Sequence, residues 1–202
     1  MLLLGTRNPG KVREITTILH GAGWAFCSLQ EFENVGVADE IGDSYAENAM
    51  GKARFYATAT GLLSLADDSG LEVEALGGAP GVFSARYAGD DASDAERREL
   101  LLSELVKTGY ADRKARFVSV VAIADRGGGV LNVSEGVCEG TIAFAPRGEG
   151  GFGYDPLFVP DGYDQTFAEL PEAVKNRISH RARALIGARE FLSKLDHLGQ
   201  DF

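Results

Sequence analysis

Residues 62–74 read LLSLADDSGLEVE, an apolar run followed by two adjacent carboxylates. The run fits a short buried strand that ends at Asp67 and Asp68, before the turn pair Ser69-Gly70. In an open α/β sheet, ligands bind outside the carboxyl ends of the strands, so paired acids there are well placed to hold a metal ion or a water. Neighbouring residues on a strand point to opposite faces, so we expect only one of the acids to face a given site. A simple polar turn is the alternative interpretation.

The composition is that of a soluble globular protein, with 45% hydrophobic and 25% charged residues in a chain of 202. We expect residues 1–202 to form a single domain, or one domain with two lobes. The formal net charge of −10 argues against nucleic acid or anionic lipid as a partner, and no apolar run approaches the length of a membrane helix. The two cysteines, Cys27 and Cys138, form neither a disulfide framework nor a zinc motif, which favours a cytoplasmic location.

Residues 5–11 read GTRNPGK and lead into a predicted helix. Asn8 is a good N-cap and Pro9 a good first helical residue, so the loop ends at a helix N-terminus. Free backbone N–H groups and the positive end of the helix dipole favour an anion site, and Lys11 adds a full charge in the first turn. A well-capped surface helix would show the same residues, so both interpretations stay open here.

The same loop nearly matches a P-loop, because its spacing is G-x-x-x-x-G-K. A P-loop needs Ser or Thr directly after the lysine to hold magnesium, and this chain has Val12 there. Pro9 also removes a backbone donor from the expected phosphate cradle. Both residues argue against a P-loop.

The remaining pattern predicts an alternation of helices and strands. Capping residues and apolar periodicity indicate helices over 44–61, 93–109 and from about 179 onward. Strands are expected over 2–4, 71–74, 117–124 and 130–137, with the last two joined as a hairpin across three glycines. In the first of these helices Asn48 and Lys52 are four apart and share a face.

Two further segments are candidates for ligand binding, with a tight surface turn as the alternative for the first and a solvated, Arg-rich helix start as the alternative for the second. The second segment breaks a local rule, which is a hint of function. The glycine-rich loop 150–156 reads GGFGYDP, and exposed Phe152 and Tyr154 on a flexible backbone suit stacking on a flat ligand. His180 and Arg181 lie in the first turn of the last helix, where the helix dipole disfavours cations.

Taken together, these motifs resemble those of the inosine triphosphate pyrophosphatase family, which acts on non-standard purine nucleoside triphosphates. The matching segments occur in the family's order: TRNPGK at 6–11, YAENA at 45–49 with Lys52, ADDSGL at 66–71, GGAPG at 77–81 with SARY at 84–87, GGFGYDP at 150–156 and ISHR at 178–181. Each is a weak signal alone, whereas the ordered set is specific. The resemblance implies a two-lobed α/β fold with a long mixed β-sheet flanked by helices, a central active-site cleft, a Mg²⁺ requirement and a homodimer.

The resemblance also implies an activity, the hydrolysis of ITP, dITP or XTP to the nucleoside monophosphate and pyrophosphate, which cleanses the nucleotide pool. Catalysis is expected of Asp68, which would deprotonate the attacking water, with Lys52 and Asp67, and Mg²⁺ is expected at Glu40 and Asp68. Donors from His180 and Arg181 would match the 6-oxygen of hypoxanthine and reject the amino group of adenine. The residues expected to bind substrate are Thr6, Arg7, Asn8, Pro9, Gly10, Lys11, Ser69, Phe152, Gly153, Tyr154, Asp155, Lys175, His180 and Arg181.

Three alternatives stay open. A P-loop-like NTPase would release orthophosphate instead of pyrophosphate. A related nucleotide pyrophosphatase for pyrimidine or modified nucleotides would form the same products from another base. A nucleotide sensor would bind without hydrolysis, although such a module has little need for paired acids that hold a metal-bound water.

Overall fold

A computed structural model describes residues 1–109 and 111–198. Contacts within the chain divide it into two compact units. Unit 1 comprises Met1–Asp68, Ser119–Gly136 and the C-terminal segment from Arg181, and unit 2 comprises Ser69–Val118 and Val137–His180. That residues 1–202 act as a single two-lobed domain stays a prediction. In the described part of the chain, no helix is both long enough and apolar enough to cross a membrane.

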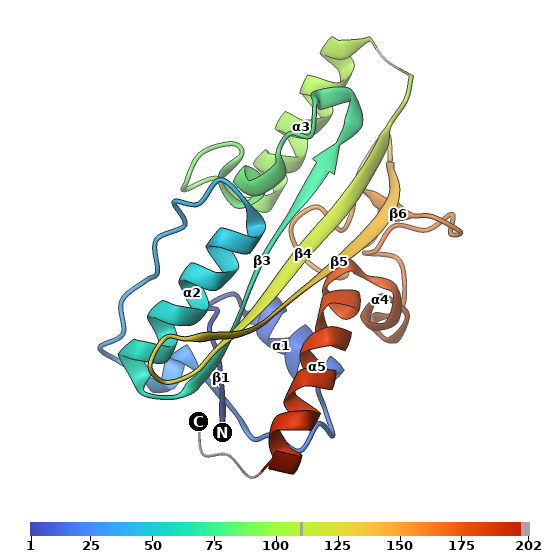
Figure 1. Ribbon diagram of the computed structural model, residues 1–202. Helices are drawn as coiled ribbons and strands as arrows, with labels where there is room; N and C mark the ends of the chain where they lie inside the picture. The colour runs from blue at the N-terminus through green and yellow to red at the C-terminus, as the bar shows by residue number, and fades with distance from the viewer. Residues whose placement is uncertain (110, 199–202) are drawn as a thin grey trace. The chain divides into compact units, whose positions relative to one another are not determined.

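The described residues form one six-stranded mixed sheet with the strand order β2-β1-β3-β4-β5-β6 (Figure 1). Strand β1 pairs in parallel with both β2 and β3, whereas β5 and β6 are antiparallel. The predicted α/β fold with a mixed sheet flanked by helices is therefore confirmed. The strands are β1 (Leu2–Leu4), β2 (Phe26–Ser28), β3 (Leu63–Val73), β4 (Lys114–Ala124), β5 (Val130–Ile142) and β6 (Phe158–Pro160).

Three helices begin at the capping residues that the sequence indicates, and two of these also end at the expected glycines. The side chains of Asn8, Ser44 and Ser93 accept hydrogen bonds from the first turns of α1, α2 and α3, and Gly61 and Gly109 end α2 and α3 in the left-handed conformation. The helices are α1 (Pro9–Ile18), α2 (Tyr45–Thr60), α3 (Asp94–Thr108), α4 (Glu172–Ile178) and α5 (His180–Leu198), with 3-10 turns η1 (Leu29–Glu31), η2 (Glu74–Leu76) and η3 (Gly81–Arg86).

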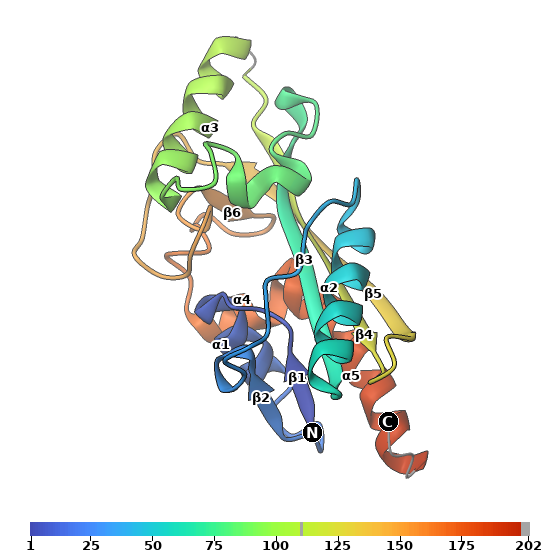
Figure 2. The same ribbon diagram turned by 90° about the vertical axis from the view of Figure 1, so that its left-hand side faces the viewer.

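Each unit has its own hydrophobic core. In unit 1, α2 lies on one face of the sheet and α1 and α5 lie on the other (Figures 1 and 2). The core under α1 and α5 is formed by Leu2, Leu4, Ile15, Leu19, Leu63, Leu65, Val121, Ile123, Ala184, Leu185, Ala188, Leu192 and Leu195. The core of unit 2 is formed by Leu71, Val73, Leu101, Leu105, Ala115, Phe117, Cys138, Ile142, Tyr154, Leu157, Phe158, Phe167 and Leu170.

The expectation that a strand ends at the paired acids is wrong. Strand β3 runs through Asp67, Asp68, Ser69 and Gly70 to Val73, so the acids lie in the middle of an eleven-residue strand. A polar turn at this position is also excluded, and Gly70 is not among the glycines with positive φ. Carboxylates are tolerated inside the strand because cations bind both of them, Lys11 at Asp67 and Lys52 at Asp68.

Candidate active site

The two acids of β3 point to opposite faces of the sheet, as the alternation along a strand predicts. Asp67 contacts Lys11 of α1, and Asp68 contacts Lys52 of α2. These two helices lie on opposite faces of the unit 1 sheet (Figure 2). The doublet therefore belongs to two different clusters of charge, both inside unit 1.

On the first face, Asp67 is completely buried and binds two cations through one oxygen. Its Oδ2 lies 3.2 Å from Lys11 Nζ and accepts a hydrogen bond of 3.1 Å from Arg181 Nε. Arg181 is only 1% exposed, and its Nη1 also donates to Oε2 of Glu14 on α1. Buried charges are rare unless they are paired, so this cluster is a connected set of ion pairs rather than a solvated helix start.

Burial and the neighbouring charges together set the pKa values of this cluster. Burial acts to raise the pKa of Asp67, but Lys11, Arg181 and Lys52 outweigh it and hold that pKa far below its usual range. Burial lowers the pKa of Lys11, although Asp67 opposes the shift. Burial acts to lower the pKa of Arg181, but Asp67 and Glu14 raise it above its usual value. Asp67 therefore stays ionised and serves as a fixed negative charge.

On the second face of the sheet, the ammonium group of Lys52 contacts two carboxylates. Lys52 Nζ lies 2.7 Å from Glu40 Oε1 and 2.8 Å from Asp68 Oδ1. Asn48, one helical turn before Lys52, donates from Nδ2 to Asp68 Oδ2 at 3.3 Å and accepts from the N–H of Gly42 at 2.8 Å. Asn48 thereby ties the acid of β3 to the segment that carries Glu40.

The pKa of Asp68 shifts in the direction opposite to that of Asp67. Burial raises the pKa of Asp68, and Glu40 adds to the shift, although Lys52 and Lys11 oppose it. Burial acts to lower the pKa of Lys52, but Asp68, Asp67 and Glu40 outweigh it and raise that pKa. A carboxylate with a raised pKa is a better proton acceptor than an ordinary one, which suits a general base.

Glu40 and Asp68 are a suitable pair for Mg²⁺. The described residues contain no group of three or more His, Cys, Asp or Glu side chains that could hold a metal ion. Mg²⁺ keeps several of its waters and is usually bound through one or two carboxylates together with substrate phosphates. Two carboxylates that already meet at one cation match that requirement.

The loop before α1 holds the expected residues in a tight local arrangement. The side-chain oxygen of Asn8 accepts from the N–H groups of Gly10 and Lys11, at 2.8 and 3.2 Å, and the Thr6 hydroxyl accepts from the N–H of Asn8. The expectation of free N–H groups is therefore wrong at these two positions, because the cap uses them. Arg7 donates to the carbonyl of Val35.

Val12 settles the P-loop question at the position that the motif requires. Its side chain is partly buried and packs against the core of unit 1. A hydroxyl that holds magnesium would have to stand there. The chain therefore lacks the magnesium ligand of a P-loop.

Unit 2 brings together a second set of expected residues around the loop 150–156. Asp155 Oδ2 accepts from the N–H of Phe152 at 2.8 Å and forms a buried ion pair with Lys175 of α4. Lys175 Nζ lies 4.9 Å from the centroid of the Phe152 ring, over its face. The carboxylate of Asp155 thus binds both the backbone of Phe152 and the ammonium group that lies over the Phe152 ring.

Two other expected residues of unit 2 are more buried than the sequence suggests. His180 is buried and stacks on Phe117 of β4, with ring centroids 4.5 Å apart and planes 11° apart. The expectation that Tyr154 is exposed is wrong: Tyr154 lies in the core of unit 2, and its hydroxyl donates a hydrogen bond to the carbonyl of Ser84. Its aromatic ring has a core position to fill, which a pattern of glycines and aromatics does not reveal. Burial raises the pKa of Tyr154, so the hydroxyl remains a donor.

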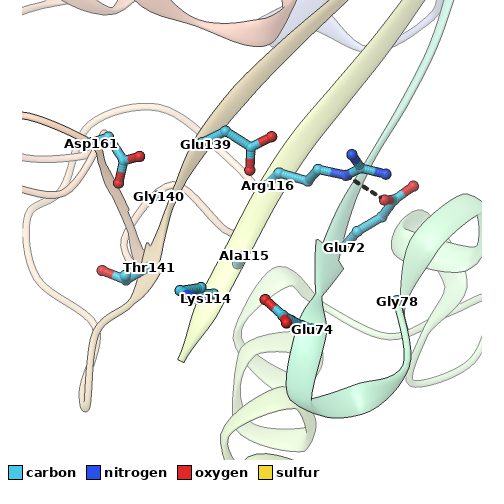
Figure 3. A pocket seen from close by; sticks show the side chains of 10 residues that line it. All are labelled: Glu72, Glu74, Gly78, Lys114, Ala115, Arg116, Glu139, Gly140, Thr141 and Asp161. Atoms are coloured by element: carbon cyan, nitrogen blue, oxygen red, sulfur yellow. Dashed lines mark hydrogen bonds and ion pairs between the residues drawn. The ribbon is translucent and has the colours of Figure 1, made fainter. Parts of the chain in front are cut away.

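A hollow of about 530 Å³ on the sheet of unit 2 contains none of the expected residues (Figure 3). Arg116 crosses from β4 to β3 and pairs with Glu72 at 2.8 Å. Four carboxylates and only two cations line this hollow, so it is a poor site for a polyphosphate. Its lining residues are Glu72, Glu74, Gly78, Lys114, Ala115, Arg116, Glu139, Gly140, Thr141 and Asp161.

The chain is similar to known proteins over nearly its whole length. The profile of the Ham1 family matches residues 2–191, which is nearly the whole chain. The chain belongs to the Ham1 family. A Ham1 relative from Desulforamulus reducens, a dITP/XTP pyrophosphatase, is 49% identical over 194 residues, which are 96% of this chain and 96% of the relative. A dITP/XTP pyrophosphatase from Geobacter sulfurreducens is 47% identical over 198 residues, covering 98% of this chain and 96% of its own.

The Ham1 fold is also seen in solved structures. A HAM1 protein from Coxiella burnetii superposes with a TM-score of 0.87 at 42% identity, over 96% of this chain and 98% of that one. The resemblance to the inosine triphosphate pyrophosphatase family that the motifs indicate is therefore confirmed. The roles of the individual Ham1 residues in this chain stay predictions.

Some residues make contacts near the expected sites that the sequence does not predict. Glu14 has only a weak signal, a carboxylate one helical turn after Lys11. Asn48 shares a helix face with Lys52, but nothing in the pattern connects it to Asp68. Asp94 and Arg98 of α3 bind the backbone of Gly153, and no motif points to them.

Proposed function

We propose that this Ham1 protein hydrolyses the non-standard purine nucleoside triphosphates dITP, ITP and XTP to the nucleoside monophosphate and pyrophosphate. The observation that carries the proposal is the meeting of Glu40 and Asp68 at the ammonium of Lys52, because two carboxylates and a cation at one point are suited to hold a metal ion and phosphates. The names of the two relatives, both dITP/XTP pyrophosphatases, support the substrate class. The product follows from attack at the α-phosphorus.

In the proposed step, Asp68 accepts a proton from a water while the water oxygen forms a bond to the α-phosphorus. The bond from this phosphorus to the oxygen that bridges the α- and β-phosphates breaks, and pyrophosphate leaves with that oxygen and both bonding electrons. Glu40 and Asp68 would hold Mg²⁺, directly or through its waters. Bound there, the ion would neutralise negative charge on the phosphate oxygens.

The other residues of unit 1 would supply charge and position. Lys52 and Lys11 would stabilise the negative charge that the triphosphate carries and that the leaving pyrophosphate gains. Asp67 would hold Lys11 and Arg181 in place, which is the support expected of it. Thr6 and the side chain of Asn8 would contribute donors from the loop before α1.

The residues of unit 2 would bind the base. Phe152 would stack on the purine; Asp155 binds its backbone N–H, and Lys175 lies over its ring. His180 would donate to the 6-oxygen of hypoxanthine or xanthine, so that the amino group of adenine would leave the donor unpaired. The substrate-binding roles of Arg7, Pro9, Gly10, Ser69, Gly153, Tyr154 and Arg181 stay part of the same proposal.

We also propose that the enzyme works in the cytoplasm as a Mg²⁺-dependent homodimer, with nucleotides rather than nucleic acid or membranes as its partners. The acidic balance of 30 Asp and Glu against 20 Lys and Arg supports the last point, because it repels polyanionic surfaces. Light scattering during size-exclusion chromatography would test the dimer, since a molar mass near the 21.5 kDa of one chain contradicts it.

The decisive experiment is an assay of product identity. The purified protein is incubated with ITP, XTP, dITP, GTP, ATP and UTP in the presence of Mg²⁺, and pyrophosphate and orthophosphate are measured separately. We expect pyrophosphate from ITP, dITP and XTP and little from ATP. Orthophosphate would favour an NTPase, hydrolysis of UTP a pyrimidine pyrophosphatase, and no turnover a binding protein.

Two variants make the assay specific to the proposed site. Asp68→Asn removes the proton acceptor but keeps the shape, so it should reduce turnover at least about 100-fold, in the range that a positioned general base contributes. Glu72→Gln is the matched control, because it removes a carboxylate of the same strand that lies outside both clusters. Equal activity of the Asp68→Asn variant and the wild type would remove Asp68 from the mechanism.

A further inference from the structure

Two side chains of α3 hold the loop 150–156 at a single residue. Asp94 Oδ2 accepts the N–H of Gly153 at 2.7 Å, and Arg98 Nη1 donates to the carbonyl oxygen of Gly153 at 2.7 Å. These two hydrogen bonds hold the two peptide groups that flank the Cα of Gly153. Hydrogen bonds in which one partner is charged are among the stronger ones in proteins.

The two side chains are themselves anchored. Asp94 and Arg98 are four apart on α3, so they project from the same helix face. Arg97 Nη1 binds the other oxygen of Asp94, Oδ1, at 2.7 Å, so both carboxylate oxygens are engaged. Leu101 of the same helix is buried in the core of unit 2. The carboxylate of Asp94 is therefore held at both oxygens, and its side chain is 41% exposed.

Gly153 is the residue where such a grip matters most. Its φ is +61°, a conformation that residues with a side chain rarely adopt, and Gly150 and Gly151 precede Phe152 in the same loop. A glycine populates many backbone conformations when it is unrestrained. Fixing the N–H and the carbonyl of Gly153 restrains the direction in which the chain leaves Phe152, the residue that carries the aromatic ring.

We infer that Asp94 and Arg98 are positioning residues for purine binding. By holding Gly153 in place, they keep the Phe152 ring in the orientation that stacks on the base. The inference rests on the proposed function, because it takes the base of the nucleotide as the ligand of Phe152. Neither residue belongs to the motifs that carry the family resemblance. Neither is expected to touch the phosphates or the attacking water.

The test compares steady-state kinetics of Asp94→Ala and Arg98→Ala with two substrates, ITP and ribose 5-triphosphate, which lacks the base. Each variant should raise KM for ITP about tenfold and change kcat by less than about twofold, because one charged hydrogen bond is lost from the clamp. Turnover of ribose 5-triphosphate should equal that of the wild type. Arg98→Lys, which keeps a charged donor, should recover most of the affinity for ITP.

Glu104→Ala is the matched control, since Glu104 lies on α3 and pairs only with Lys107 among the contacts described for it. Thermal unfolding of every variant separates a lost clamp from a lost fold. If Asp94→Ala and Arg98→Ala bind ITP as the wild type does, or lose ribose 5-triphosphate and ITP equally, the inference is overturned. If the wild type releases no pyrophosphate from ITP, the proposed function itself fails, and the inference fails with it.

Discussion

Arg181→Met tests whether the buried ion pairs of unit 1 hold that unit together. The guanidinium group lies between Asp67 and Glu14, whose side chains are 0% and 5% exposed, and it is itself 1% exposed. Removing one partner of a buried ion pair costs about 3–5 kcal/mol, because the remaining charge stays buried. Lys11 still faces Asp67 in the variant, so we expect a loss in the free energy of unfolding of about 3–5 kcal/mol rather than the sum of two pairs.

The loss can be measured by thermal and urea unfolding of the purified variant. For a chain of this size, 1 kcal/mol shifts the unfolding midpoint by about 2–4 °C, so the expected shift is roughly 6–20 °C. Arg189→Met is the matched control, because Arg189 is exposed on the same helix. A surface change of this kind should stay within about 0.5 kcal/mol. A loss below about 1 kcal/mol for Arg181→Met would refute the reasoning.

A second variant isolates the pair from other effects of the substitution. Glu14→Met combined with Arg181→Met removes a carboxylate together with the cation that binds it, and leaves Asp67 with Lys11. This double variant should be more stable than Arg181→Met alone, because it also removes the buried carboxylate that loses Arg181. If the double variant is the less stable of the two, the cost of Arg181→Met does not come from the carboxylate of Glu14.

Three further predictions concern substrate, metal and core. Phe152→Ala should raise KM for ITP about tenfold, since stacking of a base on an aromatic ring contributes about 1–3 kcal/mol, whereas Phe152→Trp should keep the affinity. Equal KM values for the two variants would contradict the stacking role of Phe152. Removal of divalent ions with EDTA should stop pyrophosphate release, and added Mg²⁺ should restore it. Glu40→Gln should raise the Mg²⁺ concentration needed for half-maximal rate, and an unchanged Mg²⁺ concentration at half-maximal rate would exclude Glu40 as a ligand. Leu65→Ala should lower the free energy of unfolding by about 2–5 kcal/mol in a urea titration, because Leu65 is completely buried in the core of unit 1. A loss of less than about 1 kcal/mol would contradict that packing.

Signals that act within one turn of chain were the most reliable. Asn8, Ser44 and Ser93 were expected to cap helices, and each does so, because a cap depends on N–H groups two or three residues away. The stripe of buried residues on α5 likewise follows from helical spacing. Short elements left no such signal: three residues of β2 or β6 are too few to show a period, and α4 has no side-chain cap.

Interactions between distant parts of the sequence could not be predicted in the same way. Arg181 lies 167 residues from Glu14 and 114 from Asp67, so only the fold reveals that the three charges meet. The family resemblance selected Arg181 for the site but assigned it to the base, without the carboxylates that bind it. The continuity of β3 was missed for a related reason, since Asp-Asp-Ser-Gly favours a turn until Lys11 and Lys52 are placed beside it.

The acid doublet itself shows how two identical side chains can acquire different chemistry. The pleat of β3 sends Asp67 towards α1 and α5, and Asp68 towards α2. Asp67 meets two cations at one oxygen, so its pKa falls far below the usual range and it cannot accept a proton in any useful range of pH. Asp68 shares Lys52 with a second carboxylate, Glu40, so burial prevails and its pKa is raised. Only Asp68 is therefore suited to take a proton from water, whereas Asp67 is suited to hold Lys11 and Arg181. Because each role depends on the helix that faces the acid, exchanging the two roles would require exchanging the helices on the two faces of the sheet.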